Sequence, residues 1–267
     1  MKPDKLTLAL AQMDIILGDR QANLARGREL AQEAAARGAN LLILPELWTT
    51  GYDLARAAEL AEPIPDGPSA RVLADWAQEL DLWITGSMLE RTPAGLFNAA
   101  PLFGPRGQIL GPYRKIHRFG PMTEDRWLEA GCEPGLFDPP WGKTGVAICY
   151  DLRFPELFRR YALAGARLIL LPSQWPAPRR HHWRTLAQAR AIENQCFVAA
   201  VNRVGQDREN VFGGHSMLVG PWGEIIAEAG ETPELLIAAI DLAQADAARQ
   251  RIPVLDDRRP ECYSQEA

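Results

Sequence analysis

Two short, wholly apolar segments that each run into a proline constrain the fold of this chain more than any other feature. They are Leu41-Leu-Ile-Leu-Pro45 and Leu168-Ile-Leu-Leu-Pro172. A strand without a polar side chain on either face must be covered on both faces, which is typical of a parallel sheet flanked by other layers. Helical patterns lie on both sides of each segment. The chain is therefore expected to contain one β-α-β-α-β unit twice.

Local patterns predict the other elements of each unit. In the first half we expect strands at 5–13, 41–44 and 82–88, helices from Asp19 or Asn23 to about Arg37 and at 68–80, and a hairpin of 97–103 and 108–113. In the second half we expect strands at 143–148, 168–171, 196–202 and 235–240, helices at 155–164 and 180–194, and a hairpin of 215–219 and 224–228. Gly and Pro clusters mark both hairpin loops.

The repeated unit predicts two sheets packed face to face with helices outside. This is an α/β fold: a four-layer α-β-β-α sandwich with two mixed sheets and an internal pseudo-two-fold repeat. No linker-like segment separates the halves, so we expect residues 1–267 to form a single domain. The tail from about 245 to 267 is rich in Arg, Asp and Pro. We interpret it as too polar for the core and expect it to pack at a subunit interface.

Composition and charge exclude several classes of protein. The chain is 47% hydrophobic and 24% charged, as expected for a globular protein. Its net charge of −5 disfavours a nucleic-acid partner. We find no signal-peptide pattern and no apolar run of membrane-spanning length, so we expect a cytoplasmic protein without a membrane partner. The four cysteines and four histidines lack the spacing of a disulfide framework or a metal site.

Three reactive side chains, Glu46, Lys115 and Cys149, follow directly on predicted strands. Glu46 follows the apolar strand of the first half, Lys115 the first hairpin, and Cys149 the first strand of the second half. Sheets of this kind collect active-site groups at the carboxyl ends of their strands. A thiol at a strand-to-helix turn also faces backbone N–H groups that stabilise negative charge. Taken alone, Cys149 fits a small buried hydrophobic residue better than a nucleophile, but the three together indicate an active site.

The segments around these residues resemble the three signatures of the nitrilase, or carbon–nitrogen hydrolase, superfamily in order and spacing. The segments are 44–52, 113–117 and 148–156, and the resemblance extends from 6 to about 263. It implies an α-β-β-α sandwich and a Glu46-Lys115-Cys149 triad. The family's further active-site glutamate falls on Glu124, seven residues before Gly131. Glu129 lies nearby and stays open as the alternative.

These residue types are suited to hydrolysing an amide through a thioester. A free cysteine is mostly protonated at neutral pH, so Glu46 is expected to take the thiol proton while the Lys115 cation favours the thiolate. Lys115 and the backbone N–H of Tyr150 are expected to stabilise the oxyanion. Glu46 then protonates the departing ammonia and activates water, and Glu124 holds Lys115 and the substrate amide. The partners are a small-molecule amide and water, and this chemistry requires no metal and no organic cofactor.

Substrate choice is expected to depend on side chains that flank the catalytic motifs. The candidates for the pocket are Trp48, Tyr52, Arg153, Phe154 and Trp175. Each aromatic ring has core packing as its alternative. Arg153 is expected either to bind a substrate carboxylate or to form a structural ion pair. Arg179 and Arg180 are interpreted as the solvated start of a helix.

The segments 172–179, 182–183, 189–195 and 201–205 resemble the omega-amidase-like branch of the family. That resemblance implies amide hydrolysis of a small carboxylate-bearing substrate such as 2-oxoglutaramate. N-carbamoyl compounds, deaminated glutathione and nitriles are the alternative substrates of related branches. The family also implies a homodimer or a larger homo-oligomer, for which we expect the helix at 155–164 and the tail to supply contacts.

Two other readings compete with the triad. In a papain-like pair, Cys149 would be activated by His215, which lies in a predicted strand, or by His117. That reading leaves Glu46 and Lys115 without a role. In a non-catalytic reading the chain is a binding or scaffold protein on the same fold.

Overall fold

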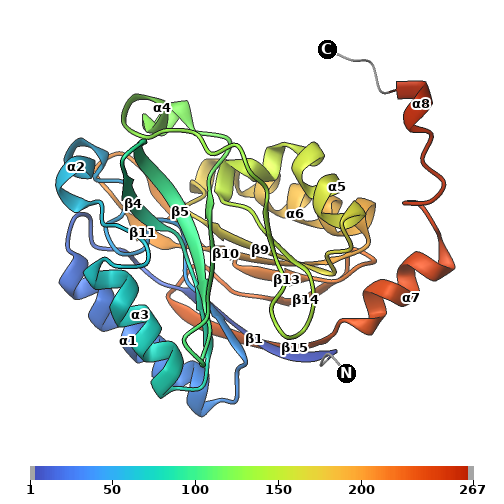
Figure 1. Cartoon of the computed structure of the whole chain (residues 1–267), viewed down its shortest axis with the longest axis horizontal. Coiled ribbons are helices and arrows are strands. Elements are labelled where there is room, and N and C mark those ends of the chain that lie inside the picture. Colours follow the sequence, from blue (N-terminus) through green and yellow to red (C-terminus); the bar gives the residue numbers. More distant parts are fainter. Residues whose placement is uncertain (1–3, 264–267) are drawn as a thin grey trace.

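Two β-sheets pack face to face between two layers of helices in the computed structural model, which describes residues 4–263 (Figure 1). Helices α1 (Arg20–Ala36) and α3 (Pro68–Glu79) cover the outer face of the first sheet. Helices α5 (Pro155–Leu163) and α6 (Arg180–Asn194) cover the second sheet. The predicted four-layer α-β-β-α sandwich is confirmed.

Both sheets are mixed. The first has seven strands in the order β15-β1-β2-β3-β5-β4, with β6 paired to β5, and the second has six in the order β14-β13-β10-β9-β8-β7. The strands of the first sheet are β1 (Lys5–Gln12), β2 (Leu41–Ile43), β3 (Trp83–Thr85), β4 (Met88–Thr92), β5 (Gly95–Phe103), β6 (Ile109–Arg114) and β15 (Glu234–Asp241). Those of the second are β7 (Gly135–Phe137), β8 (Thr144–Val146), β9 (Leu168–Ser173), β10 (Phe197–Asn202), β13 (Met217–Val219) and β14 (Ile225–Glu228).

Strand order confirms the internal repeat. Strands β1, β2 and β3 are parallel and β5 runs antiparallel beside β3. In the second sheet β8, β9 and β10 are parallel and β13 runs antiparallel beside β10. The two apolar segments of the sequence form the equivalent central strands β2 and β9.

Each half also supplies one strand to the sheet of the other half. Strand β7 closes the first half and pairs antiparallel with β8, the first strand of the second half. Strand β15 closes the second half and pairs antiparallel with β1 over eight residue pairs, from Lys5–Asp241 to Gln12–Glu234. We call β7 and β15 the exchanged strands, since each completes a sheet that its own half does not build.

The side-chain alternation of β1 and β2 explains how the layers fit together. Leu8, Leu10, Leu41 and Ile43 point into the core between the sheets, whereas Ala9, Ala11 and Leu42 point toward α1 and α3. Successive residues of a strand face opposite sides. The central strand β2 is therefore apolar on both faces because both faces are covered, as its sequence predicts.

Helix boundaries follow capping signals in the sequence. The Asp19 side chain accepts a hydrogen bond from the Ala22 N–H at 3.0 Å and caps α1. Gly38 follows that helix with φ of +75°, a conformation that glycine adopts readily. Pro155 occupies the first position of α5. Helix α6 spans the predicted 180–194.

The predicted strand at 82–88 is confirmed only for its first part, β3, and is wrong in its length. Strand β3 ends at Thr85 and a separate strand, β4, begins at Met88. Between them the Ser87 hydroxyl accepts the Leu47 N–H at 2.8 Å, and the Ser87 N–H donates to the Pro45 carbonyl at 3.2 Å. The strand is interrupted here because the backbone and side chain of Ser87 form hydrogen bonds with the loop around Glu46 instead of with a neighbouring strand.

Several short elements were not predicted. They are β4, β7, the two-stranded pair β11 (Val204–Gln206) and β12 (Val211–Gly213), α2 (Ala57–Leu60), α4 (Glu124–Trp127), α7 (Ala243–Arg251) and α8 (Pro260–Tyr263). The strand predicted from residue 215 begins later, because His215 precedes β13 with φ of +55°. Within residues 4–263, no helix combines the length and the hydropathy that crossing a bilayer requires.

The tail was predicted to be too polar for the core, and this is wrong for its first part. Ala245 and Ala248 of α7 are buried in the chain's own core region. The Gln195 side-chain amide donates to the carbonyls of Ala248 and Ile252 at 3.1 and 2.8 Å, which fixes α7 to the end of α6. Beyond α7 the chain leaves the body of the molecule, as Figure 1 shows for α8. Residues 264–267 of the predicted tail lie outside the described residues.

Candidate active site

The predicted triad residues come from three different strands and lie at one site. Glu46 follows β2, Lys115 follows β6, and Cys149 follows β8 as the first residue of a short 3-10 turn. Their exposed fractions are 0%, 1% and 4%. The carboxyl ends of strands from both sheets therefore bring these groups together in a buried site.

Lys115 lies between two carboxylates. Its Nζ donates to Glu46 Oε1 at 2.7 Å and to Glu124 Oε2 at 2.6 Å. Glu124 Oε2 also accepts the Phe119 N–H at 2.6 Å. Glu129 lies elsewhere: its backbone N–H donates to the Leu96 carbonyl. Thus the structure brings Glu124, and not Glu129, to the triad.

A residue that sequence reasoning missed, Asn98, joins the two carboxylates. Its Nδ2 donates to Glu46 Oε1 at 2.9 Å and to Glu124 Oε1 at 3.0 Å. Its carbonyl accepts the Lys115 N–H across the β5–β6 pair. The available signal was a lone amide side chain in an apolar strand, because a buried polar group needs hydrogen-bonding partners.

Burial and charge set the protonation of the cluster. Burial alone would lower the pKa of Lys115, but Glu124 and Glu46 outweigh it and raise that pKa, so the side chain is an ammonium. Burial raises the pKa of Glu124, against the opposing charge of Lys115.

The surroundings of Cys149 favour the thiol over the thiolate. Burial and then the nearby Glu46 charge raise its pKa well above the usual range, and Lys115 and the Gln174 N–H oppose them. Lys115 lowers the pKa of the Cys149 thiol, as expected, but burial and Glu46 raise it by more. Attack by this thiol consequently requires a base, and Glu46 is the neighbouring carboxylate.

Cys149 has an unusual backbone conformation, with φ of +46°. The turn that holds it is fixed by Asp151, whose Oδ2 accepts the Ile148 N–H at 2.8 Å and the Tyr113 hydroxyl at 2.7 Å. Asp151 Oδ1 accepts the His117 N–H at 3.1 Å and lies 2.7 Å from His117 Nδ1. This buried carboxylate therefore links the turn of Cys149 to the segment that carries Lys115.

The two histidines of the papain-like reading have other partners. His117 contacts Asp151 and stacks on Phe154 with ring centroids 3.6 Å apart. His215 Nδ1 lies 3.1 Å from Glu228 Oε1. This geometry argues against a Cys–His pair. Phe154, predicted to line the pocket, contacts His117 and Tyr150 but is not among the residues that line the cavity at Cys149.

A small cavity opens directly beside Cys149. Its volume is about 10 Å³, close to that of one water probe. It is lined by Phe119, Cys149, Tyr150, Arg153, Trp175, Pro176 and Arg179. The Arg153 guanidinium lies 4.8 Å from the centroid of the Trp175 ring, and that of Arg179 lies 5.4 Å from the Phe119 ring. Predicted pocket residues Arg153 and Trp175 are therefore at the site, together with Arg179, which was assigned to a solvated helix start.

Neither guanidinium of this cavity has a carboxylate partner among residues 4–263. Arg153 Nη2 contacts His182 Nδ1 at 3.2 Å. The structural ion pair considered for Arg153 is thus absent from the described part of the chain. The neighbouring Arg180 differs, since it is exposed and paired with Glu231.

Tyr52 contacts the site in a different way from that expected. Its hydroxyl donates to Glu46 Oε1 at 2.7 Å. Burial, followed by the charges of Glu124 and Glu46, raises its pKa well above the usual range, so it remains a donor. Trp48 is not brought to the site: it is buried in the core under α1 and α3, 6.4 Å from the Trp76 ring.

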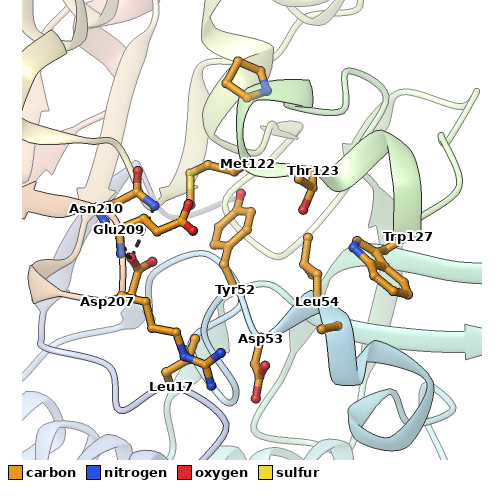
Figure 2. A pocket seen from close by; sticks show the side chains of 13 residues that line it. Leu17, Tyr52, Asp53, Leu54, Met122, Thr123, Trp127, Asp207, Glu209 and Asn210 are labelled. Atoms are coloured by element: carbon orange, nitrogen blue, oxygen red, sulfur yellow. Dashed lines mark hydrogen bonds between the residues drawn. The ribbon is translucent and has the colours of Figure 1, made fainter.

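A second cavity of about 230 Å³ lies on the other side of Tyr52. Figure 2 shows Tyr52 in its middle, between the Asp207–Asn210 loop on one side and Leu54 and Trp127 on the other. Because the hydroxyl of Tyr52 bonds Glu46, its ring stands between this cavity and the triad.

The carbon–nitrogen hydrolase family model matches residues 7–250. The chain belongs to this family. It is therefore a hydrolase of carbon–nitrogen bonds other than peptide bonds, and the non-catalytic scaffold reading is set aside.

Proteins to which the chain is similar within this family include named amidases. The chain is 42% identical to the 2-oxoglutaramate amidase of Bacillus subtilis over 97% of this chain and 100% of that protein. It is 36% identical to the omega-amidase NIT2 of Mus musculus over 100% and 99% of the two chains. In structure it is similar to a mutant of the amidase from Nesterenkonia sp. AN1, with a TM-score of 0.85, 29% identity, and coverage of 97% of this chain and 95% of that one. In that mutant the acetamide moiety of fluoroacetamide is covalently added at the active site cysteine.

Proposed function

We propose that this amidase releases ammonia from a small carboxylate-bearing amide of the 2-oxoglutaramate type, with Cys149 as nucleophile. The observation that carries the substrate class is the pair Arg153 and Arg179, two guanidiniums that line the cavity at Cys149 and have no carboxylate partner among residues 4–263. A guanidinium recognises a carboxylate by paired hydrogen bonds. The similarity to a 2-oxoglutaramate amidase supports the same class.

Acylation begins with proton transfer from Cys149 Sγ to Glu46. The sulfur attacks the amide carbonyl carbon, and the carbonyl oxygen becomes an oxyanion. Lys115 Nζ and the Tyr150 N–H stabilise this charge; loss of one such donor typically costs about a hundred- to a thousandfold in rate. As the tetrahedral intermediate collapses, Glu46 returns the proton to the nitrogen, which leaves as ammonia. The product is a thioester on Cys149.

Deacylation uses the same carboxylate again. Glu46 takes a proton from water as the water oxygen attacks the thioester carbon. The second oxyanion is held by the same donors. Collapse breaks the carbon–sulfur bond, releases the carboxylic acid, and returns the proton to Sγ. Glu124 holds Lys115 in place through their 2.6 Å contact, and we assign Tyr52 to orienting Glu46 through their 2.7 Å contact.

The substrate lies with its amide at Cys149 and its carboxylate toward Arg153 and Arg179. Trp175 forms part of the same wall. The unliganded cavity is small, so these side chains must move apart as the substrate enters. N-carbamoyl compounds, deaminated glutathione and nitriles are the alternative substrates that the same triad could process.

Ammonia release distinguishes these substrates. The purified protein is assayed with 2-oxoglutaramate, succinamate, an N-carbamoyl amino acid and a simple nitrile at matched concentrations. We expect the highest kcat/KM for the carboxylated amides. A higher value for the nitrile or the carbamoyl compound would overturn the proposed substrate class and leave the triad unaffected.

We also propose a homodimer or a larger homo-oligomer. Leu163 of α5 and Ile192 of α6 are exposed large apolar side chains on the outer helical layer, and the segment after α7 leaves the body of the molecule. Light scattering during size exclusion measures the assembly, and a monomer at micromolar concentration would refute it. The single domain of residues 1–267, the cytoplasmic location and the exclusion of nucleic-acid and membrane partners stay predictions of the sequence.

A further inference from the structure

Gln174, which immediately follows β9, contacts Glu46 from two directions. Its backbone N–H donates to Glu46 Oε2 at 2.9 Å, and its side-chain Nε2 donates to the Glu46 carbonyl at 2.6 Å. Both residues are fully buried. Because β9 is the counterpart of β2, this contact joins the equivalent strand ends of the two sheets at the catalytic carboxylate.

The two oxygens of Glu46 differ in their partners. Oε1 accepts hydrogen bonds from Lys115, Tyr52 and Asn98. Among residues 4–263, Oε2 accepts a hydrogen bond from one N–H group, the backbone N–H of Gln174. A carboxylate oxygen has about two lone-pair sites, so Oε1 is saturated. Oε2 is consequently the oxygen with capacity to receive the thiol proton, and its direction depends on Gln174.

Arg203, between β10 and β11, fixes the Gln174 side chain. Its Nη1 donates to Gln174 Oε1 at 3.0 Å. Its Nη2 donates to Asp14 Oδ1 at 2.7 Å and to the Ile15 carbonyl at 2.9 Å. The amide of Gln174 is thereby held at its oxygen by Arg203 and at its nitrogen by Glu46.

Stability alone gives little reason to bury an arginine here. Arg203 is 0% exposed, and burial lowers its pKa, against the opposing charge of Asp14. A buried ion pair can often be replaced by apolar side chains without loss of stability. An apolar side chain, however, could not orient the Gln174 amide, because it has no N–H group to donate to Gln174 Oε1.

Asn202, which precedes Arg203, holds Trp175, which follows Gln174, by two hydrogen bonds of its own. Asn202 Oδ1 accepts the Trp175 N–H at 2.7 Å, and Asn202 Nδ2 donates to the Trp175 carbonyl at 3.1 Å. Two consecutive side chains therefore fix two consecutive residues of the loop. One of these, Gln174, contacts Glu46, and the other, Trp175, lines the cavity at Cys149.

We propose that Arg203 and Gln174 are positioning residues for proton transfer: Arg203 orients the Gln174 amide, and Gln174 aims Glu46 Oε2 at the Cys149 thiol. This role rests on the proposed function of Glu46 as the base and extends it to two residues that touch no reacting atom. It predicts that disturbing Gln174 slows thiol activation more than it weakens substrate binding.

Gln174→Met tests the proposal, since it keeps the side-chain length and the backbone N–H but removes both side-chain hydrogen bonds. A displacement of about 1 Å at a reacting group can cost roughly a hundredfold in rate, so we expect kcat to fall about 10- to 100-fold. KM should change less than about threefold. Alkylation of Cys149 by iodoacetamide, which needs no substrate, should slow by the same factor as kcat. Arg203→Met should lower the same two rates, because it removes the hydrogen bond to Gln174 Oε1. Asp14→Asn weakens the ion pair that holds Arg203 and should give a smaller loss in the same direction, so it replaces Arg203→Met in the test if that variant does not fold.

Arg167→Met is the matched control. Arg167 is a partly buried arginine with two carboxylate partners, Asp4 and Asp246, at the opposite end of the strands. Its loss should lower stability without changing kcat or alkylation of the folded protein. Folded Gln174→Met with both rates within about twofold of the wild type would overturn the positioning role. Glu46→Gln separates the two hypotheses, because near-normal turnover in that variant would instead overturn Glu46 as the base.

Discussion

Replacing Lys115 by methionine removes the positive charge that lies between Glu46 and Glu124. In the native protein the ammonium lies 2.7 and 2.6 Å from these carboxylates, and all three side chains are at most 1% exposed. The small values typical of surface ion pairs therefore do not apply. Breaking a buried pair by removing one partner typically costs about 3–5 kcal/mol, because a charge is left without compensation.

The size of this loss should depend on pH. Burial already raises the pKa of Glu124 against the opposing charge of Lys115, and without that charge the pKa rises further. A carboxyl whose pKa is raised on folding holds a proton that the unfolded chain has released. Its stabilisation is complete below the unfolded pKa of about 4.3 and is lost as the pH rises through the folded value. One such proton changes the free energy of unfolding by about 1.4 kcal/mol per pH unit, hence by up to about 4 kcal/mol between pH 5 and pH 8.

Urea unfolding of the wild type and Lys115→Met at about pH 5 and pH 8 measures this difference. We expect the variant to be close to the wild type at the lower pH and about 3–5 kcal/mol less stable at the higher one. The double variant Lys115→Met with Glu124→Gln should lose most of the pH dependence, because the carboxyl that holds the proton is gone. Equal destabilisation at both pH values would refute the electrostatic reasoning.

Three further predictions concern single side chains. Arg179→Met should raise KM for 2-oxoglutaramate about 10- to 100-fold, since a charge-assisted hydrogen bond contributes about 1.5–3 kcal/mol, whereas the adjacent Arg180→Met should leave KM unchanged. Asp151→Asn should lower the free energy of unfolding by about 1–3 kcal/mol and reduce kcat, because it weakens the buried link between the Cys149 turn and the Lys115 segment; full activity with unchanged denaturation would contradict that link. Glu124→Gln should reduce kcat by about a hundredfold or more and Glu129→Gln should not, and the reverse order would contradict the assignment of Glu124.

The sequence predicts those parts of the fold whose signals are local. The apolar segments at 41–44 and 168–171 identify the two central strands, and Asp19 and Gly38 place the ends of α1 within about one or two residues. The exchanged strand β7 was missed, because three residues at the edge of a sheet carry too short a pattern. Strand β15 was predicted, but its partner was not, since alternation of side chains says nothing about which strand lies beside it.

The same distinction applies to the site. Glu46, Lys115, Glu124 and Cys149 lie in contiguous motifs, and the structure brings them together. Gln174 contacts Glu46 from 128 residues away along the chain, and no local pattern reports such a contact. Trp48 was expected in the pocket because it is near Glu46 in sequence. It points instead to the core, where Gly27 and Gly86 leave room for its ring: a Cβ on either would lie within 3.0 Å of it.

The exchanged strands give the chain the topology of a domain-swapped dimer whose two copies have been joined end to end. The first half produced alone would keep β7, which pairs with β8 of the other half, and would leave the edge of β1 uncovered, because β15 would be missing. An uncovered strand edge is a template for aggregation. Two fragments cut between β7 and β8 should instead assemble when expressed together, held by the eight-residue ladder of β1 with β15. Because the triad draws Glu46 and Lys115 from one fragment and Cys149 from the other, activity would report that reassembly directly.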